Sequence, residues 1–124
     1  MAFRRKVLVI DDEQPVREAV SDILDLEGIV VLAAASGQEG IELYRQNQDD
    51  IKLILLDMSM PGMDGEQTLR HLRKISADVF VILSSGYTET AISQRMLDGG
   101  VTGFLQKPFD MAGLINTVRL YLDG

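Results

Sequence analysis

The sequence of 124 residues has no cysteine and no tryptophan, and its only histidine is His71. The absence of cysteine excludes disulfide bonds, thiolate metal ligands and a cysteine nucleophile. A single histidine excludes a metal site built from several imidazoles. No apolar stretch approaches the roughly 20 residues of a membrane-spanning helix, and no long apolar segment follows the basic residues near the start, as a signal peptide requires. We therefore expect a cytoplasmic chain without a membrane segment.

Positive charge is also scarce, because 12 basic residues face 19 acidic ones and the formal net charge is −7. Direct nucleic-acid binding usually needs a basic surface, and anionic membranes repel an acidic one. Hydrophobic residues make up 46% and charged residues 25%, which is ordinary for a globular protein. A chain of this length can bury a core of its own. We expect one domain over residues 1–124, with no nucleic-acid or membrane partner.

Five short apolar or β-branched runs alternate with segments of helical periodicity. The runs span residues 7–10, 29–33, 53–56, 79–83 and 102–105. Several are continuously apolar, which is typical of strands buried on both faces of a parallel sheet. The alternation predicts an α/β fold in which an open, doubly wound parallel sheet of five strands is covered by five helices.

The helices between these strands have recognisable starts and stops, and Ser36, with Glu39 in a capping box, and Asp110 are predicted N-caps. The helices are predicted from Pro15 to Gly28, Ser36 to about Gln48, Asp64 to about Ile75, Thr88 to Gly99–Gly100, and from Asp110 onward. In the last helix, apolar residues at helical spacing form a stripe: Met111, Leu114, Ile115, Val118 and Leu122.

Polar side chains follow four of the five predicted strands. Asp11 and Asp12 come after the first strand and Asp57 after the third; Ser84 and Ser85 come after the fourth, and Lys107 closely follows the fifth. In open parallel sheets, ligands bind beyond the carboxyl ends of the strands, near the point where strand order reverses. If the first and third strands are neighbours, three carboxylates converge near one ammonium group.

Such a cluster is restrictive, because two carboxylates about 5 Å apart repel by roughly 3 kcal/mol at an effective dielectric near 20. It must raise a pKa, bind a cation or recruit a basic partner. An aspartate after a strand is often only a turn former, but an adjacent pair, a third aspartate, a serine and a Lys-Pro are hard to explain as separate turns. With one lysine against three carboxylates, the pattern favours Mg²⁺. The isomer of the Lys107–Pro108 bond stays open.

Four segments, taken together and in this order, resemble the receiver domain of the two-component response-regulator family. They are residues 7–13, 55–65, 83–86 and 103–109. The resemblance covers essentially the whole chain and implies a flavodoxin-like fold with strand order 2-1-3-4-5. Two stretches, 83–89 and 103–109, look most like receivers attached to hybrid sensor kinases.

The resemblance also implies the chemistry of the site. Asp57 is the implied phosphoacceptor, which takes a phosphoryl group from a phosphohistidine of a histidine kinase or a histidine phosphotransfer domain. Asp12 would ligate Mg²⁺ directly and Asp11 mainly through water, while Asp57 and the backbone carbonyl of Ser59 would complete the protein ligands.

The remaining implied roles concern the phosphoryl group and the switch. Ser85 would hydrogen-bond one phosphoryl oxygen and Lys107 would pair with another; Ser84 is the rival candidate for the serine role. Phe104 stands at the switch position, where many relatives carry tyrosine. Its movement would change the face formed by the helix after Thr88, the strand at 102–105 and the last helix, for a downstream protein target or a fused kinase.

The expected protein is not an enzyme, because it supports only its own phosphorylation and autodephosphorylation. The alternative is a phosphohydrolase of the haloacid-dehalogenase type, which also uses an aspartyl phosphate and Mg²⁺. That class needs a second aspartate two residues after the nucleophile, where this chain has Ser59. A flavin-binding flavodoxin would need a Ser/Thr/Gly-rich loop after the first strand, where this chain is acidic. The sequence leaves open a homodimer and whether the chain is part of a larger protein.

Overall fold

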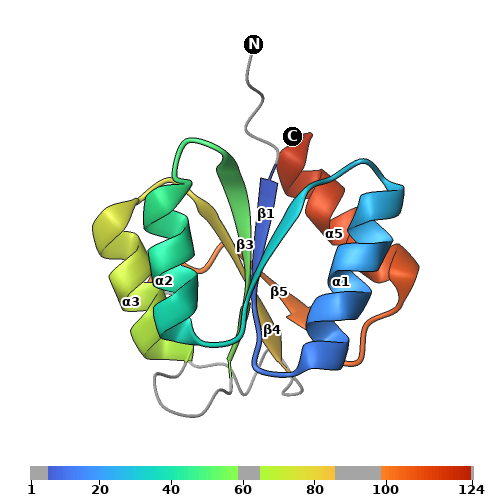
Figure 1. Cartoon of the computed structure of the whole chain (residues 1–124), viewed down its shortest axis with the longest axis horizontal. Helices are drawn as coiled ribbons and strands as arrows, with labels where there is room; N and C mark the ends of the chain where they lie inside the picture. Colours follow the sequence, from blue (N-terminus) through green and yellow to red (C-terminus); the bar gives the residue numbers. More distant parts are fainter. Residues whose placement is uncertain (1–5, 59–64, 86–98, 124) are drawn as a thin grey trace.

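Figure 1 shows the computed structural model of the chain, which describes residues 6–58, 65–85 and 99–123. Five parallel strands form one sheet in the order β2-β1-β3-β4-β5. The strands are β1 (Lys6–Ile10), β2 (Val31–Ala34), β3 (Ile51–Asp57), β4 (Phe80–Ser85) and β5 (Gly103–Gln106). The predicted fold class and strand order are confirmed.

Helices cover both faces of this sheet. In the described residues they are α1 (Gln14–Leu26), α2 (Gly37–Gln46), α3 (Gly65–Ile75) and α5 (Met111–Leu122). Helices α1 and α5 lie on one face, and α2 and α3 on the other (Figure 1). The predicted helix from Thr88 and the predicted cap at Asp64 lie outside the described residues. Among the described helices, none combines the length and apolarity that a bilayer crossing requires.

The end of α1 corrects the predicted second strand. The N–H groups of Gly28 and Ile29 donate to the carbonyl oxygens of Asp25 and Leu24, and Gly28 has a φ of +73°. This is the Schellman pattern that ends helices at a glycine. Because Ile29 uses its N–H to close the helix, it cannot join the sheet, and β2 begins at Val31 instead. Ile29 still contributes to the core, since its side chain is buried.

Two predicted helix caps are confirmed. The Ser36 hydroxyl accepts from the Glu39 N–H, and the Glu39 carboxylate reaches back to the Ala35 N–H, at 2.6 Å. At α5, Asp110 Oδ1 accepts from the Gly113 N–H at 2.7 Å. Met111, the first residue of the predicted apolar stripe, is 50% exposed. It begins the helix, beyond the end of the buried stripe of Leu114, Val118 and Leu122.

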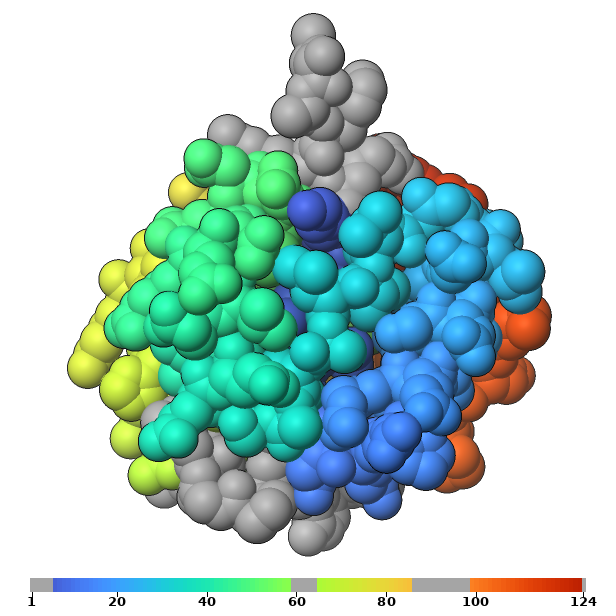
Figure 2. Space-filling model, viewed as in Figure 1, coloured from blue at the N-terminus to red at the C-terminus, as the bar shows by residue number. Residues whose placement is uncertain are grey.

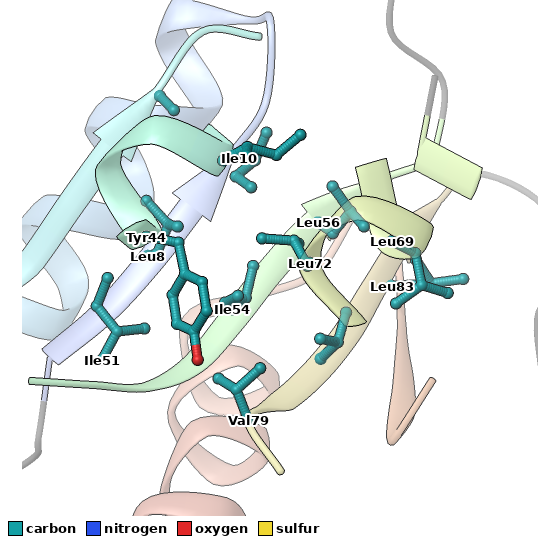
Figure 3. Close-up of a cluster of buried hydrophobic side chains, with 13 residues drawn as sticks. Leu8, Ile10, Tyr44, Ile51, Ile54, Leu56, Leu69, Leu72, Val79 and Leu83 are labelled. Atoms are coloured by element: carbon teal, nitrogen blue, oxygen red, sulfur yellow. The ribbon is translucent and has the colours of Figure 1, made fainter. Parts of the chain in front are cut away.

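Alternate residues of the strands build two separate cores. The core under α2 and α3 contains Leu8, Ile10, Ile54 and Leu56 from the central strands, together with Tyr44 (Figure 3). The other core, under α1 and α5, is built from the intervening strand positions and buried helix residues, among them Val7, Val9, Leu53, Leu55, Ile82 and Leu105. Because side chains alternate along a strand, Asp11, Asp57 and Ser84 continue the α1/α5 side. The side chains of these three residues therefore leave the sheet on the same side.

The edge strand β2 is flanked by α1 and α2 on the face shown in Figure 2. β1 lies inside the sheet, between β2 and β3, and its last four residues are buried. The two central strands that carry Asp11 and Asp57 are therefore covered by helices on both faces. The polar side chains that follow these strands lie at the carboxyl edge of the sheet, beyond the part that the helices cover.

Candidate functional site

The strand register brings the predicted carboxylates to one place. Ile10 of β1 pairs with Leu56 of β3, so the residues that follow them, Asp11 and Asp57, come level at the edge of the sheet. Carboxylate oxygens of Asp11, Asp12 and Asp57 lie within 4.8 Å of one another. Asp11 and Asp57 are 2% and 4% exposed, whereas Asp12 is exposed. The predicted convergence of three acidic side chains is confirmed.

Lys107 reaches into this cluster from the end of β5. Its Nζ lies 2.8 Å from Asp11 Oδ2, 3.5 Å from Asp57 Oδ1 and 3.7 Å from Glu13 Oε2. Its backbone N–H donates to the Ser85 carbonyl at 2.7 Å, and the Lys107–Pro108 peptide bond is cis. Burial by itself lowers the pKa of Lys107, but the hydrogen bond to Asp11 and the charges of Asp11, Asp57 and Glu13 outweigh it and raise the pKa above its usual value.

Two residues that sequence reasoning missed fix the position of Asp11. Asp11 Oδ1 accepts from the Glu13 N–H at 2.9 Å, and its backbone carbonyl accepts from Arg17 Nη1 at 2.7 Å. With Lys107 on Oδ2, both carboxylate oxygens of Asp11 are engaged. Glu13 could have been found as the third acidic residue of a row, but the role of Arg17 depends on how α1 packs beside β1.

The cluster offers a set of oxygen donors with excess negative charge. Among the described residues, the clustered carboxylates of Asp11, Asp12 and Asp57, with Glu13 beside them, outnumber the ammonium group of Lys107, and hard divalent cations prefer such oxygen ligands. The residues therefore fit a cation of the Mg²⁺ type. The predicted carbonyl ligand at Ser59 lies outside the described residues.

A glycine allows α3 to begin directly beside the phosphoacceptor candidate. The Gly65 N–H donates to the Met58 carbonyl at 3.2 Å. A Cβ at Gly65 would lie 2.8 Å from the carbonyl oxygen of Asp57 and 2.8 Å from Met58 Cα. Any other residue would push the helix away from the strand end, so this close approach requires glycine.

The remaining predicted residues lie around this cluster. Ser84 is the register partner of Asp57 across β3 and β4, and Ser85 pairs with Gln106 of β5. Both serines are buried. Phe104 is half-buried and packs against the core under α2 and α3, on the opposite side of the sheet from the core that contains Leu105. Its predicted role as a switch remains a prediction.

A groove of about 470 Å³ opens next to the cluster. Lys107 and Glu13 line it, and its other walls are apolar, with Pro15, Ala19 and Phe109 among them. It runs between the start of α1 and the connection from β5 to α5. A partner protein that reached the carboxylates from this side would contact an apolar surface next to the ammonium group of Lys107.

A five-stranded parallel sheet of this order, with an acidic cluster and a lysine at its carboxyl edge, defines a receiver-type signalling domain. The sequence profile of the response regulator receiver domain matches residues 7–119, and the chain belongs to this family. The match gives no support to the phosphohydrolase alternative.

Relatives and solved structures agree with this assignment. The chain is 37% identical over 117 residues to the sensor kinase CckA of Brucella abortus, covering 94% of this chain and 12% of the kinase. It is 31% identical over 120 residues to sporulation initiation phosphotransferase F of Bacillus subtilis, covering 97% and 95% of the two chains. The structure of the chemotaxis protein CheY4 of Vibrio cholerae superposes with a TM-score of 0.89 at 30% identity, covering 98% of this chain and 99% of that one.

Proposed function

We propose that this receiver accepts a phosphoryl group on Asp57 from a phosphohistidine of a histidine kinase or a histidine phosphotransfer domain in the cytoplasm, and that residues 1–124 act as one domain. The observation that carries the proposal is the position of Asp57. Its carboxylate lies in a cluster with Asp11 and Asp12, with Lys107 Nζ 3.5 Å from Oδ1, at the edge where ligands bind in such sheets.

The transfer step assigns a task to each side chain. A carboxylate oxygen of Asp57 attacks phosphorus, the P–N bond of the phosphohistidine breaks, and the imidazole nitrogen keeps the electron pair. Lys107 neutralises one equatorial phosphoryl oxygen and the Ser85 hydroxyl donates to another, so fixed donors meet the charge of the transition state. The product is an acyl phosphate. Its hydrolysis returns the resting protein, so no external substrate is turned over.

The acidic residues would bind Mg²⁺ in different ways. Asp12, which is exposed, would ligate the ion directly, whereas Asp11, already held by Lys107 and the Glu13 N–H, would act mainly through water. Asp57 would be a further ligand, and the Ser59 carbonyl, which lies outside the described residues, is the last one expected. When bound, Mg²⁺ would supply the positive charge that lets a carboxylate approach a phosphoryl dianion.

The surfaces around this edge of the sheet suggest where the phosphodonor and the downstream partner bind. The groove beside Lys107 offers the phosphohistidine-bearing domain an apolar contact close to Asp57. After phosphorylation, Ser85 approaches the phosphoryl group and Phe104 turns inward, which alters the surface of β5 and α5. The resemblance to part of the sensor kinase CckA supports a fused kinase as the downstream element; a separate protein target is the other candidate.

Mass spectrometry after incubation with acetyl phosphate and Mg²⁺ tests the proposal. We expect one added phosphoryl group on Asp57 in the wild type and none in Asp57→Asn, with the circular dichroism spectrum unchanged. Asp49→Asn is the matched control, because Asp49 is exposed, precedes β3 and lies away from the carboxyl ends of the strands. Labelling that persists in Asp57→Asn, or that EDTA leaves unchanged, would contradict the assignment.

A further inference from the structure

Ser84 is a buried serine whose hydroxyl the receiver chemistry above does not use. It is 5% exposed, and its Oγ has no hydrogen-bond partner among the described residues. The preceding position on this side of β4 is Ile82, which belongs to the apolar core under α1 and α5. Buried hydroxyls are almost always hydrogen-bonded, because an unmet one loses its bonds to water without replacement. We therefore expect the Ser84 hydroxyl to form a hydrogen bond with a bound molecule.

A small cavity of about 10 Å³ lies beside this hydroxyl. Its lining surface is almost entirely apolar, with Leu55 and Leu105 contributing to it, and Ser84, Asp57 and Asp11 are the polar residues among those that line it. One water molecule needs about 10–15 Å³ and two to four polar partners. The volume matches a single water, and the Ser84 hydroxyl and the Asp57 carboxylate are polar groups among the residues that line it.

The spacing of the strands suits a water bridge. Asp57 and Ser84 are register partners, and neighbouring strands lie about 4.8 Å apart. If the Ser84 and Asp57 side-chain oxygens stand apart by about the strand spacing, two hydrogen bonds of about 2.8 Å each, meeting at one water, span the gap. Val16 and Phe109 line both this cavity and the surface groove, so the two spaces are adjacent.

We propose that this cavity is a binding site for one water molecule, which links the Ser84 hydroxyl to the carboxylate of Asp57. Ser84 is then a positioning residue, because the water helps Lys107 to fix the orientation of the phosphoacceptor oxygens. This second part rests on the proposed function of Asp57, whereas the water site itself does not.

High-resolution crystal structures of the wild type and of Ser84→Ala test the water site. In the wild type we expect electron density at about 2.8 Å from Ser84 Oγ and within hydrogen-bond distance of Asp57. In Ser84→Ala that density is lost. A dry cavity in the wild type, or a Ser84 hydroxyl bonded to a protein carbonyl instead, overturns the proposal.

The rate of labelling by acetyl phosphate with Mg²⁺ tests the positioning role. We expect Ser84→Ala to slow it about three- to tenfold, the loss that corresponds to one ordinary hydrogen bond. The carboxyl ¹³C shift of Asp57 at fixed pH should change as well. Ser76→Ala is the matched control, because its hydroxyl accepts from the N–H groups of Asp78 and Val79 at the opposite end of β4; it should alter neither readout.

The outcomes separate the two proposals. Loss of the water with an unchanged rate and carboxyl shift overturns the positioning role. Failure of the wild type to label on Asp57 refutes the proposed function, while the electron density still decides the water site.

Discussion

At the scale of single residues, the site depends on the electrostatic balance around Lys107. Its side chain is 19% exposed, and it faces Asp11 and Asp57, which are both almost fully buried. Exposed ion pairs contribute little to stability because water and salt screen them. Here burial limits screening, so removing the ammonium takes away a cation that lies within 3.5 Å of both the Asp11 and the Asp57 carboxylates. Lys107 therefore stabilises the fold as well as serving the proposed chemistry.

We expect Lys107→Met to lower the free energy of unfolding by about 1–3 kcal/mol at neutral pH in EDTA, because an unpaired buried charge is costly. Urea denaturation measures the change. Lys52→Met is the matched control, since the Lys52 ammonium donates to the Leu122 carbonyl at the other end of the molecule, and we expect it to cost less than about 1 kcal/mol. Equal losses in the two variants would show that the carboxylates do not depend on Lys107.

The pH dependence of that difference follows from the raised pKa of Lys107. The folded protein binds the lysine proton more tightly than the unfolded chain does. The stabilisation is therefore fully present below the ordinary pKa of 10.5 and is lost as the pH rises through the higher folded value. The gap between wild type and Lys107→Met should stay constant from about pH 8 to 10 and narrow above that range. A gap that widens in alkali would contradict the ion-pair geometry.

At the scale of elements, Arg73 ties three segments together. This α3 side chain donates to the carbonyl oxygens of Ser76 after its own helix, Val79 at the start of β4, and Gly100 before β5. Burial lowers the pKa of Arg73, with Tyr44 and Asp78 acting in the opposite direction. Gly100 has a φ of +94°, and a Cβ there would lie 2.6 Å from Arg73 Nε. The turn before β5 is thus shaped around this guanidinium group.

We expect Arg73→Ala to lower the free energy of unfolding by about 2–3 kcal/mol, because hydrogen bonds to a charged group are stronger than neutral ones. Thermal unfolding and hydrogen exchange at β5 measure the effect. The matched control is Arg70→Ala on the same helix, where the exposed pair with Glu66 is worth less than about 0.5 kcal/mol. If both variants lowered the free energy of unfolding by the same amount, the hydrogen bonds from Arg73 to the turn before β5 would contribute no measurable stability.

At the scale of the whole molecule, the acidic cluster couples cation binding to folding. The oxygens of Asp11, Asp12 and Asp57 come together only in the folded sheet, because they belong to two strands that are far apart in the chain. A ligand that binds the folded state alone stabilises it, by about 2.7 kcal/mol at a free concentration of 100 times Kd. The stability of the entire domain therefore reports on this one edge.

We expect Mg²⁺ to raise the melting temperature of the wild type reversibly, with EDTA restoring the original value. In Asp57→Asn the increase should be much smaller, because one of the three carboxylates is gone. Asp49→Asn should behave like the wild type. Differential scanning calorimetry checks all three proteins, and equal increases in all of them would indicate binding to diffuse surface charge instead of to the cluster.

The sequence by itself determined the local features of this protein. Continuous apolar runs and cap residues such as Ser36 and Asp110 predicted the alternation of strands and helices, because these signals act between neighbours in the chain. The strand-end positions of Asp11, Asp57 and Lys107 likewise identified the candidate site, and the order of the strands came from the family resemblance.

Only the tertiary structure decided how those parts meet. The pairing of β1 with β3 sets Asp11 level with Asp57, and the packing of α1 brings the Arg17 guanidinium to the carbonyl of Asp11. The same is true of the exposure of Met111 and of the burial of the Ser84 hydroxyl, which has no hydrogen-bond partner among the described residues. Burial and register depend on segments that are distant in sequence, so no pattern along one stretch of chain could have specified them.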